Sequence, residues 1–76
     1  MTLMTLAKAR AEMNRAFKEA RIEVMAGRRS ARMAAEGLIA VFWQFNPRFK
    51  SRKDRSLFLA WFVKKHEALG KELGAK

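Results

Sequence analysis

A nine-residue segment with almost no polar side chain constrains the fold of this chain more than any other feature. Residues 37–45 read GLIAVFWQF, in which Gln44 is the only polar side chain, and no charge occurs between Glu36 and Arg48. No rotation of such a segment gives it a solvated face. We therefore expect the rest of the chain to cover it on all sides.

The segment is predicted to be helical, although VFWQF also has strand propensity and a short apolar run is ambiguous by periodicity alone. A strand needs a partner, and nowhere else in the 76 residues do apolar and polar residues alternate between hairpin turn signals. Residues 31–35 add alanines and a methionine, which are strong helix formers, on its N-terminal side. The segment is thus the second half of a helix over residues 31–45.

A second helix is expected before it, near residues 3–26. Apolar residues spaced three and four apart run from Leu3 to Val24, and Arg10 interrupts the series. Gly27 can end this helix, because glycine readily takes the left-handed conformation that follows a helix. Ser30 can then cap the central helix.

A third helix is expected near residues 52–73. Asn46 precedes Pro47, and the residue before a proline is pushed out of the helical region, so the central helix should end there. Ser51 lies three residues before Asp54, a spacing typical of a helix start, and the apolar run LFLAWFV follows. Residues 46–50 are predicted to form a turn between the two helices, in which the Asn-Pro pair could also cap and start a short helical turn.

The predicted fold is therefore all-α, a small three-helix bundle that forms one domain over residues 1–76. A chain of this size buries only about 60% of its unfolded surface, and it has no cysteine to form a disulfide. Stability should be marginal, so we expect a homodimer through the apolar face of the first helix as one route to further burial. The predicted core consists of Leu38, Phe42, Phe45, Phe58, Trp61 and Phe62.

The charge balance indicates a polyanionic partner. The chain has 17 Lys and Arg against 7 Asp and Glu, a formal net charge of +10. So large an excess causes self-repulsion in a small domain, which a polyanion relieves. Residues 28–32 carry a net +3 and residues 48–55 a net +4, so most of the excess lies at the two joints between helices.

These two joints are the candidate binding site. Positive side chains in the first turn of a helix oppose the helix dipole, so stability alone does not explain them. Backbone N–H groups at a helix start favour anions, and basic side chains around them would make a phosphate cradle. In an up-down-up bundle the joints lie at opposite ends of the middle helix, about 22 Å apart, unless the second and third helices cross steeply. The predicted anion-binding residues are Arg28, Arg29, Arg32, Arg48, Lys50, Arg52, Lys53 and Arg55.

One aromatic residue and one histidine have two interpretations each. Phe49, between Arg48 and Lys50, could stack on an unpaired base or anchor the turn against the core, and the sequence favours the anchor. His66 lies on the apolar side of the third helix and is expected to be a core or boundary residue. With a single histidine, no cysteine, no tyrosine and no glycine-rich phosphate loop, we expect no enzymatic activity, no metal and no cofactor.

The function predicted from these features is nucleic-acid binding, mostly through the phosphate backbone, with DNA and RNA both open. The first alternative is a small regulator or inhibitor, of the kind found in phages and mobile elements, that docks on an acidic protein or a nucleoprotein complex. The second is a cationic membrane-active peptide. The uncharged intervals are too short for the roughly 20 apolar residues that span a bilayer, and no secretory signal is apparent, so we expect a cytoplasmic protein without integral membrane association.

Overall fold

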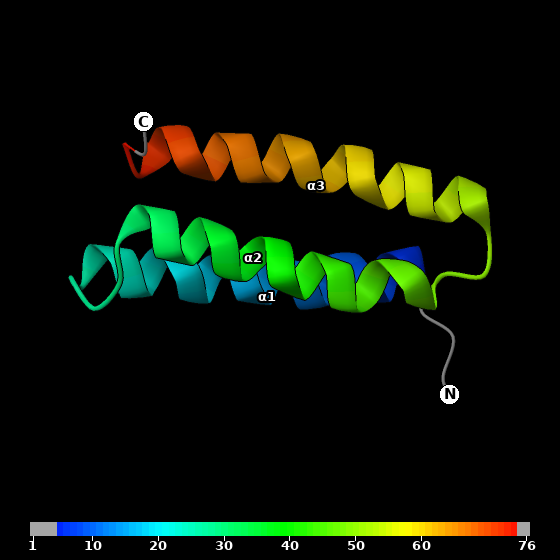
Figure 1. The fold of residues 1–76 in the computed structure, drawn as a ribbon, viewed down its shortest axis with the longest axis horizontal. Coiled ribbons are helices and arrows are strands. Elements are labelled where there is room, and N and C mark those ends of the chain that lie inside the picture. The colour runs from blue at the N-terminus through cyan, green and yellow to red at the C-terminus, as the bar shows by residue number, and fades with distance from the viewer. Residues whose placement is uncertain (1–4, 75–76) are drawn as a thin grey trace.

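The computed structural model describes residues 5–74, and they form three helices joined by two short turns (Figure 1). Helix α1 spans Leu6–Met25, α2 spans Ala31–Phe45, and α3 spans Arg52–Glu72. A short 3-10 helix, η1, occupies Asn46–Arg48. This part of the chain contains no strand, so the prediction of an all-α three-helix bundle is confirmed.

Capping residues set the helix boundaries. Thr5 is extended and its side chain accepts a hydrogen bond from the backbone N–H of Lys8, so α1 begins at Leu6; the predicted start at residue 3 lies outside the described residues. Gly27 has a φ of 77°, the left-handed conformation that ends α1. Ser30 and Ser51 cap the next two helices as predicted. The Asn46 turn continues into η1, where Pro47 lacks only an N–H that a helix start leaves unpaired.

The three helices run alternately up and down, with α2 between the other two along the chain (Figure 1). The side of α2 that faces α1 carries the small residues Ala34 and Gly37. The side that faces α3 carries Phe42, whose ring stacks at 5.2 Å on Phe58 and at 4.7 Å on Phe62. A core of aromatic rings therefore joins α2 to α3.

The predicted core is confirmed in four of its six positions. Leu38, Phe42, Phe58 and Phe62 are buried, whereas Phe45 and Trp61 are only half-buried. The remaining buried residues come from all three helices and the second turn; they are Ala9, Met13, Phe17, Ala20, Ala34, Phe49 and Leu69.

On α1 the buried series passes through Ala9 and leaves Arg10 exposed. The guanidinium of Arg10 lies 5.9 Å from the ring centroid of Trp61, close enough for a cation–π contact. The apolar face of α1 packs within this chain, since Ala9, Met13, Phe17 and Ala20 are all buried. Homodimerisation stays a prediction, and the exposed apolar surface lies mainly elsewhere.

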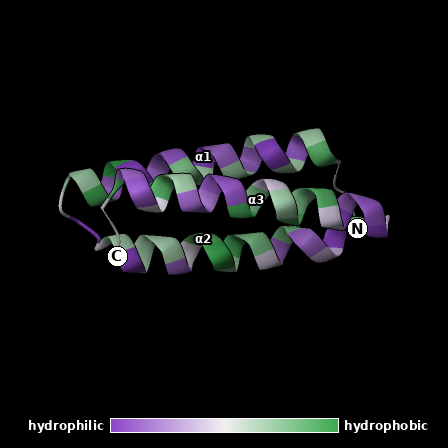
Figure 2. Cartoon of the chain, turned by 90° about the horizontal axis from the view of Figure 1, so that it is seen from above, coloured by the Kyte–Doolittle hydropathy of each residue, from purple (hydrophilic) through white to green (hydrophobic). Residues whose placement is uncertain are grey.

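The expectation that residues 37–45 are covered on all sides is wrong. Ile39, Ala40, Trp43 and Gln44 are exposed, because three helices can cover only the sides of α2 that face α1 and α3. In Figure 2 the middle of α2 is hydrophobic around most of its circumference, whereas α1 and α3 alternate between hydrophobic and hydrophilic residues. An apolar surface on α2 is therefore left without a partner in this chain.

Candidate anion-binding site

The eight predicted basic residues lie at the two joints, which the bundle places at opposite ends (Figure 1). We define the first joint as residues 28–32 and the second joint as residues 48–55. The longest dimension of the structure is 37 Å, and both joints lie toward the ends of this axis. The two joints therefore form two separate cationic surfaces, as the up-down-up arrangement predicted.

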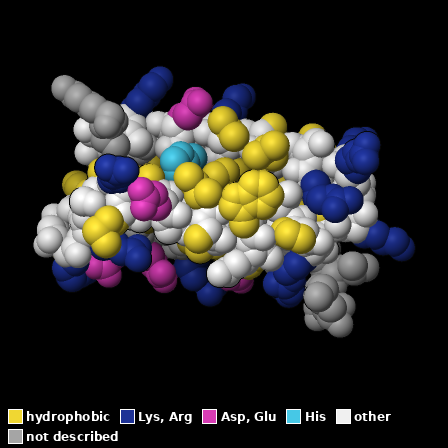
Figure 3. Space-filling view, in the orientation of Figure 1, with side chains coloured by type: hydrophobic (Ala, Val, Ile, Leu, Met, Phe, Trp, Pro, Cys, Tyr) yellow, Lys and Arg dark blue, Asp and Glu magenta, His cyan; other side chains and the backbone are white. Residues whose placement is uncertain are grey.

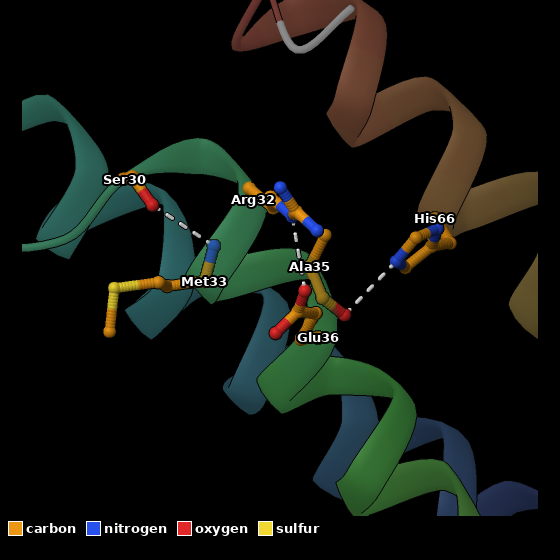
Figure 4. Close-up of polar contacts among 6 residues, drawn as sticks. All are labelled: Ser30, Arg32, Met33, Ala35, Glu36 and His66. Atoms are coloured by element: carbon orange, nitrogen blue, oxygen red, sulfur yellow. Dashed lines mark hydrogen bonds and ion pairs between the residues drawn. The ribbon is translucent and has the colours of Figure 1, made fainter.

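Carboxylates partly neutralise the first joint. Arg28 Nε donates to Glu23 Oε2 at 2.5 Å. Arg32 Nε donates to Glu36 Oε1 at 3.3 Å, and Figure 4 shows this second pair. Arg29 lines a cleft of about 590 Å³ between α1 and α2, together with Arg28, Glu19 and Glu23. The cleft at this end thus holds charges of both signs.

Cations dominate the second joint. Lys50, Arg52 and Lys53 are exposed and Arg55 is half-buried, and none of the four forms an ion pair within residues 5–74. Arg48 is half-buried in η1. Figure 3 shows the Lys and Arg side chains gathered at this end of the molecule. The second joint therefore presents most of its net charge of +4 to a ligand.

A cleft of about 360 Å³ lies within the second joint. It is lined by Asn46, Arg52, Arg55, Ser56 and Leu59, so its charged groups are two guanidiniums. Arginine presents a planar fork of donors that matches a phosphate or carboxylate. The cleft can accordingly bind an anionic oxygen group between side chains that have no carboxylate partner among the described residues.

The backbone at the start of α3 contributes less to this site than predicted. The side-chain oxygen of Ser51 accepts hydrogen bonds from the N–H groups of Lys53 at 3.1 Å and Asp54 at 3.4 Å. The N–H of Arg55 bonds to the Ser51 carbonyl at 3.1 Å. Because these groups already have partners, side chains must supply most of the donors that hold an anion.

Phe49 is part of the core and does not present a stacking surface. Its side chain is 2% exposed, and its ring centroid lies 5.1 Å from that of Phe58. The possible stacking role is thereby corrected in favour of the anchor, because a base could reach this ring only if the turn left the core. The buried ring fixes the position of the basic residues on either side of it.

His66 is half-buried at the boundary between α2 and α3, as predicted. Its Nε2 lies 3.2 Å from the carbonyl oxygen of Ala35 (Figure 4). A carbonyl can only accept, so Nε2 carries the proton in this contact. Within residues 5–74 no group of three or more His, Cys, Asp or Glu side chains could hold a metal ion.

Sequence reasoning missed two polar residues of the second cleft. Asn46 was assigned only to the turn, and its Oδ1 atom is buried without a hydrogen-bond partner in the described part of the chain. Ser56 follows Arg52 by four residues, a helical spacing that places both on one face. That spacing was the available signal, because the third helix was already expected to begin near Arg52, where the structure places it.

Comparisons with known proteins give no relative for this chain: no family model, no curated protein and no solved structure matches it. In the part of the chain that the structure describes, no helix is long and apolar enough to cross a membrane.

Proposed function

We propose that this protein binds nucleic acid through the phosphate backbone, mainly at the second joint. The observation that carries the proposal is the cluster of Lys50, Arg52, Lys53 and Arg55, none of which pairs with a carboxylate within residues 5–74. Unpaired cations can replace the counterions condensed on a phosphate backbone, and the release of those counterions favours association. The first joint is a weaker site because Glu23 and Glu36 already occupy two of its arginines.

The expected binding mode depends little on base sequence. Lysine and arginine contacts to phosphates position a protein on a nucleic acid without reading its bases. The eight predicted residues lie in the two connections and in the first turns of α2 and α3, so none of them lies in the middle of a helix. We therefore expect similar affinities for unrelated sequences, with a strong dependence on salt.

The test compares equal charge removal at the two joints. One variant replaces Lys50, Arg52 and Arg55 by Gln, and the matched control replaces Arg28, Arg29 and Arg32 by Gln. Fluorescence anisotropy with labelled duplex DNA, single-stranded DNA and an RNA hairpin gives Kd at several salt concentrations. For duplex DNA we expect the first variant to reduce the slope of log Kd against log salt by about 0.9 for each lost contact, and the control to reduce it less.

Two results would contradict the proposal. The first is a parent protein that binds none of the three probes at low salt. The second is an equal loss of affinity in the two variants, which would mean that net charge alone, and not the second joint, attracts the probe. Binding of an acidic protein would also weaken with salt, so salt dependence alone does not identify nucleic acid as the partner. The comparison of the two variants on nucleic-acid probes is therefore the deciding measurement.

A further inference from the structure

Four exposed apolar side chains form one continuous surface across α2 and α3, which we call the α2–α3 face. Ile39 and Trp43 from α2 are 41% and 61% exposed. Leu59 and Val63 from α3 are 48% and 43% exposed. Figure 3 shows hydrophobic side chains gathered over these two helices in the middle of the molecule. Exposed apolar residues are ordinary when scattered, but a contiguous group of them marks an interaction surface.

Helix geometry explains why the four residues share a side. Ile39 and Trp43 each follow a residue buried in the core, namely Leu38 and Phe42. Leu59 and Val63 likewise follow Phe58 and Phe62. Each step along a helix turns by about 100°, and in an antiparallel pair this turn carries both helices' side chains to the same side of the shared plane.

The same contacts place the four side chains within about one helical turn of each other along the bundle. Phe42 stacks on Phe58 and on Phe62, so Trp43 lies level with the turn of α3 that carries Leu59 and Val63. Ile39 lies one helical turn from Trp43, on the side of Ala35, whose carbonyl contacts His66. The result is two short apolar ridges, one on each helix, that lie side by side.

The two ends of the α2–α3 face differ in chemistry. At one end Leu59 also lines the cleft of Arg52 and Arg55, so the apolar surface continues directly into the second joint. At the other end a small cleft between α2 and α3 is lined mainly by apolar side chains, together with His66. A helix lying along the face would meet bulky apolar side chains in its middle and cations at one end.

These features select an acidic amphipathic helix as the occupant. A helix presents apolar residues three and four apart, which fit between two ridges. Its carboxylates would meet Arg52 and Arg55, which have no carboxylate partner within residues 5–74. Nucleic acid fits the face less well, because a base can stack on Trp43 but finds no complement in three aliphatic side chains.

A second copy of the chain is a poorer match. Each copy carries a formal charge of +10, so apposing two copies adds repulsion. Three of its seven carboxylates, Glu23, Glu36 and Glu72, are already in ion pairs within the chain. Few acidic groups are left to complement the cations that border the face.

We propose that the α2–α3 face binds an amphipathic helix of an acidic partner protein, with apolar side chains packed between Trp43 and Leu59 and carboxylates on Arg52 and Arg55. Binding of the helix does not depend on the proposed nucleic-acid function. One consequence does rest on that function: helix and phosphate share the two arginines, so the helix displaces nucleic acid from the second joint.

The first experiment selects ligands from a display library of 20-residue helical peptides that vary in charge and apolar pattern. We expect the parent protein to enrich peptides rich in Asp and Glu that carry apolar residues at i, i+3, i+4 and i+7. Enrichment of basic or neutral peptides, or no enrichment, would overturn the proposal. The selection contains no nucleic acid, so a parent that fails to bind oligonucleotides leaves its result valid.

The second experiment measures one enriched peptide in solution against matched variants. The face variant Trp43→Ser with Leu59→Ser is compared with Ile22→Ser with Met25→Ser, which removes two exposed apolar residues of α1 that lie outside the face. We expect the face variant to weaken binding about tenfold or more and the α1 variant to leave it within about twofold. Equal losses, or no loss in the face variant, would overturn the proposal.

A charge-reversed variant keeps the test independent of any unfolding caused by the serine substitutions. Arg52→Glu with Arg55→Glu retains the apolar face and should shift the selection from acidic toward basic peptides. An unchanged preference for acidic peptides would contradict the role given to the two arginines. Far-UV circular dichroism checks that each variant stays helical.

Two further measurements distinguish the other occupants. Sedimentation of the parent as a dimer and of the face variant as a monomer would assign the face to a second copy of the chain. A fall in affinity for single-stranded oligonucleotides in the face variant, with the affinity for the peptide unchanged, would assign the face to bases. Either result would overturn the proposal. The proposal is supported if the parent protein is a monomer and the face variant binds oligonucleotides as tightly as the parent does.

Discussion

The two joints of this bundle carry similar net charges and yet differ in what they offer to a ligand. Residues 28–32 have a net charge of +3 and residues 48–55 a net charge of +4. At the first joint Arg28 forms an ion pair with Glu23, and Arg32 forms one with Glu36. At the second joint the four basic residues from position 50 onward form no ion pair among the described residues. The number of charges therefore does not locate a site, because the position of nearby carboxylates decides which charges are available.

The joints also differ in how they are held. The first is a short turn that relies on Gly27 at a φ of 77° and contributes no buried side chain. The second is anchored by Phe49, whose ring is buried against Phe58. The buried ring of Phe49 therefore fixes the position of the basic residues in the second joint. In the first joint no buried side chain within residues 28–32 does the same.

Removing the anchor should have the largest effect. Phe49→Ala deletes a buried aromatic ring and leaves a cavity, so we expect a loss of about 3 to 5 kcal/mol in the free energy of unfolding. That is a large fraction of the stability of a small domain, which is about 5 to 15 kcal/mol. Urea denaturation followed by circular dichroism measures it. Met25→Ala, at an exposed side chain beside the first joint, is the control, and equal losses in the two variants would contradict the anchoring role.

Releasing the paired arginines should make the first joint resemble the second. Glu23→Gln with Glu36→Gln frees Arg28 and Arg32 and removes two charges that repel phosphate. Exposed ion pairs are worth at most about 1 kcal/mol each, so we expect affinity for a labelled duplex to rise about two- to tenfold. The measurement is fluorescence anisotropy at low salt.

The control for this prediction changes the net charge equally. Glu12→Gln with Glu67→Gln removes two carboxylates that form no ion pair within residues 5–74. It should raise the affinity less, because it releases no arginine. The same increase in both variants would show that net charge, and not the local pairing, distinguishes the joints.

Much of the scaffold could be predicted from local signals. Ser30, Gly27 and Ser51 fix helix ends through their own backbone and side-chain chemistry, and the structure places α2 at the predicted Ala31–Phe45. Phe42 and Phe58 lie in the core because each has apolar neighbours at helical spacing on a side that meets another helix. These features depend on residues close in sequence, which is why the sequence reveals them.

The remaining features depend on contacts between distant residues. The sequence shows that residues 37–45 are apolar, but the number of helices available to cover them decides that Trp43 stays exposed. Likewise, the availability of Arg52 depends on the absence of a carboxylate within reach among the described residues, and a charge count does not show this. The cleft of the second joint joins Asn46 of one helix end to Ser56 of the next helix, a proximity that only the fold creates.

Capping should matter about equally at the two joints for stability. Ser51→Ala removes an acceptor for the N–H groups of Lys53 and Asp54, and Ser30→Ala removes the acceptor for Met33. We expect each substitution to cost about 1 kcal/mol, and Gly at either position to cost only a few tenths. Thermal unfolding by circular dichroism measures both. If one substitution lowered the free energy of unfolding and the other did not, the cap at the unaffected joint would not be formed in solution.

Reversing one charge at the second joint should separate stability from binding. Lys53 lies in the first turn of α3, where a positive charge opposes the helix dipole. Lys53→Glu should therefore raise the free energy of unfolding by about 0.3 to 1 kcal/mol, while it weakens oligonucleotide binding. Lys71→Glu, in the last turn of the same helix, changes the net charge equally but should lower stability, because a negative charge there is unfavourable. Calorimetry and anisotropy on the two variants test both effects. If Lys53→Glu destabilised the fold, the lysine would have a structural role that explains its position without any ligand. Lys53 would then no longer count among the four cations that distinguish the second joint from the first.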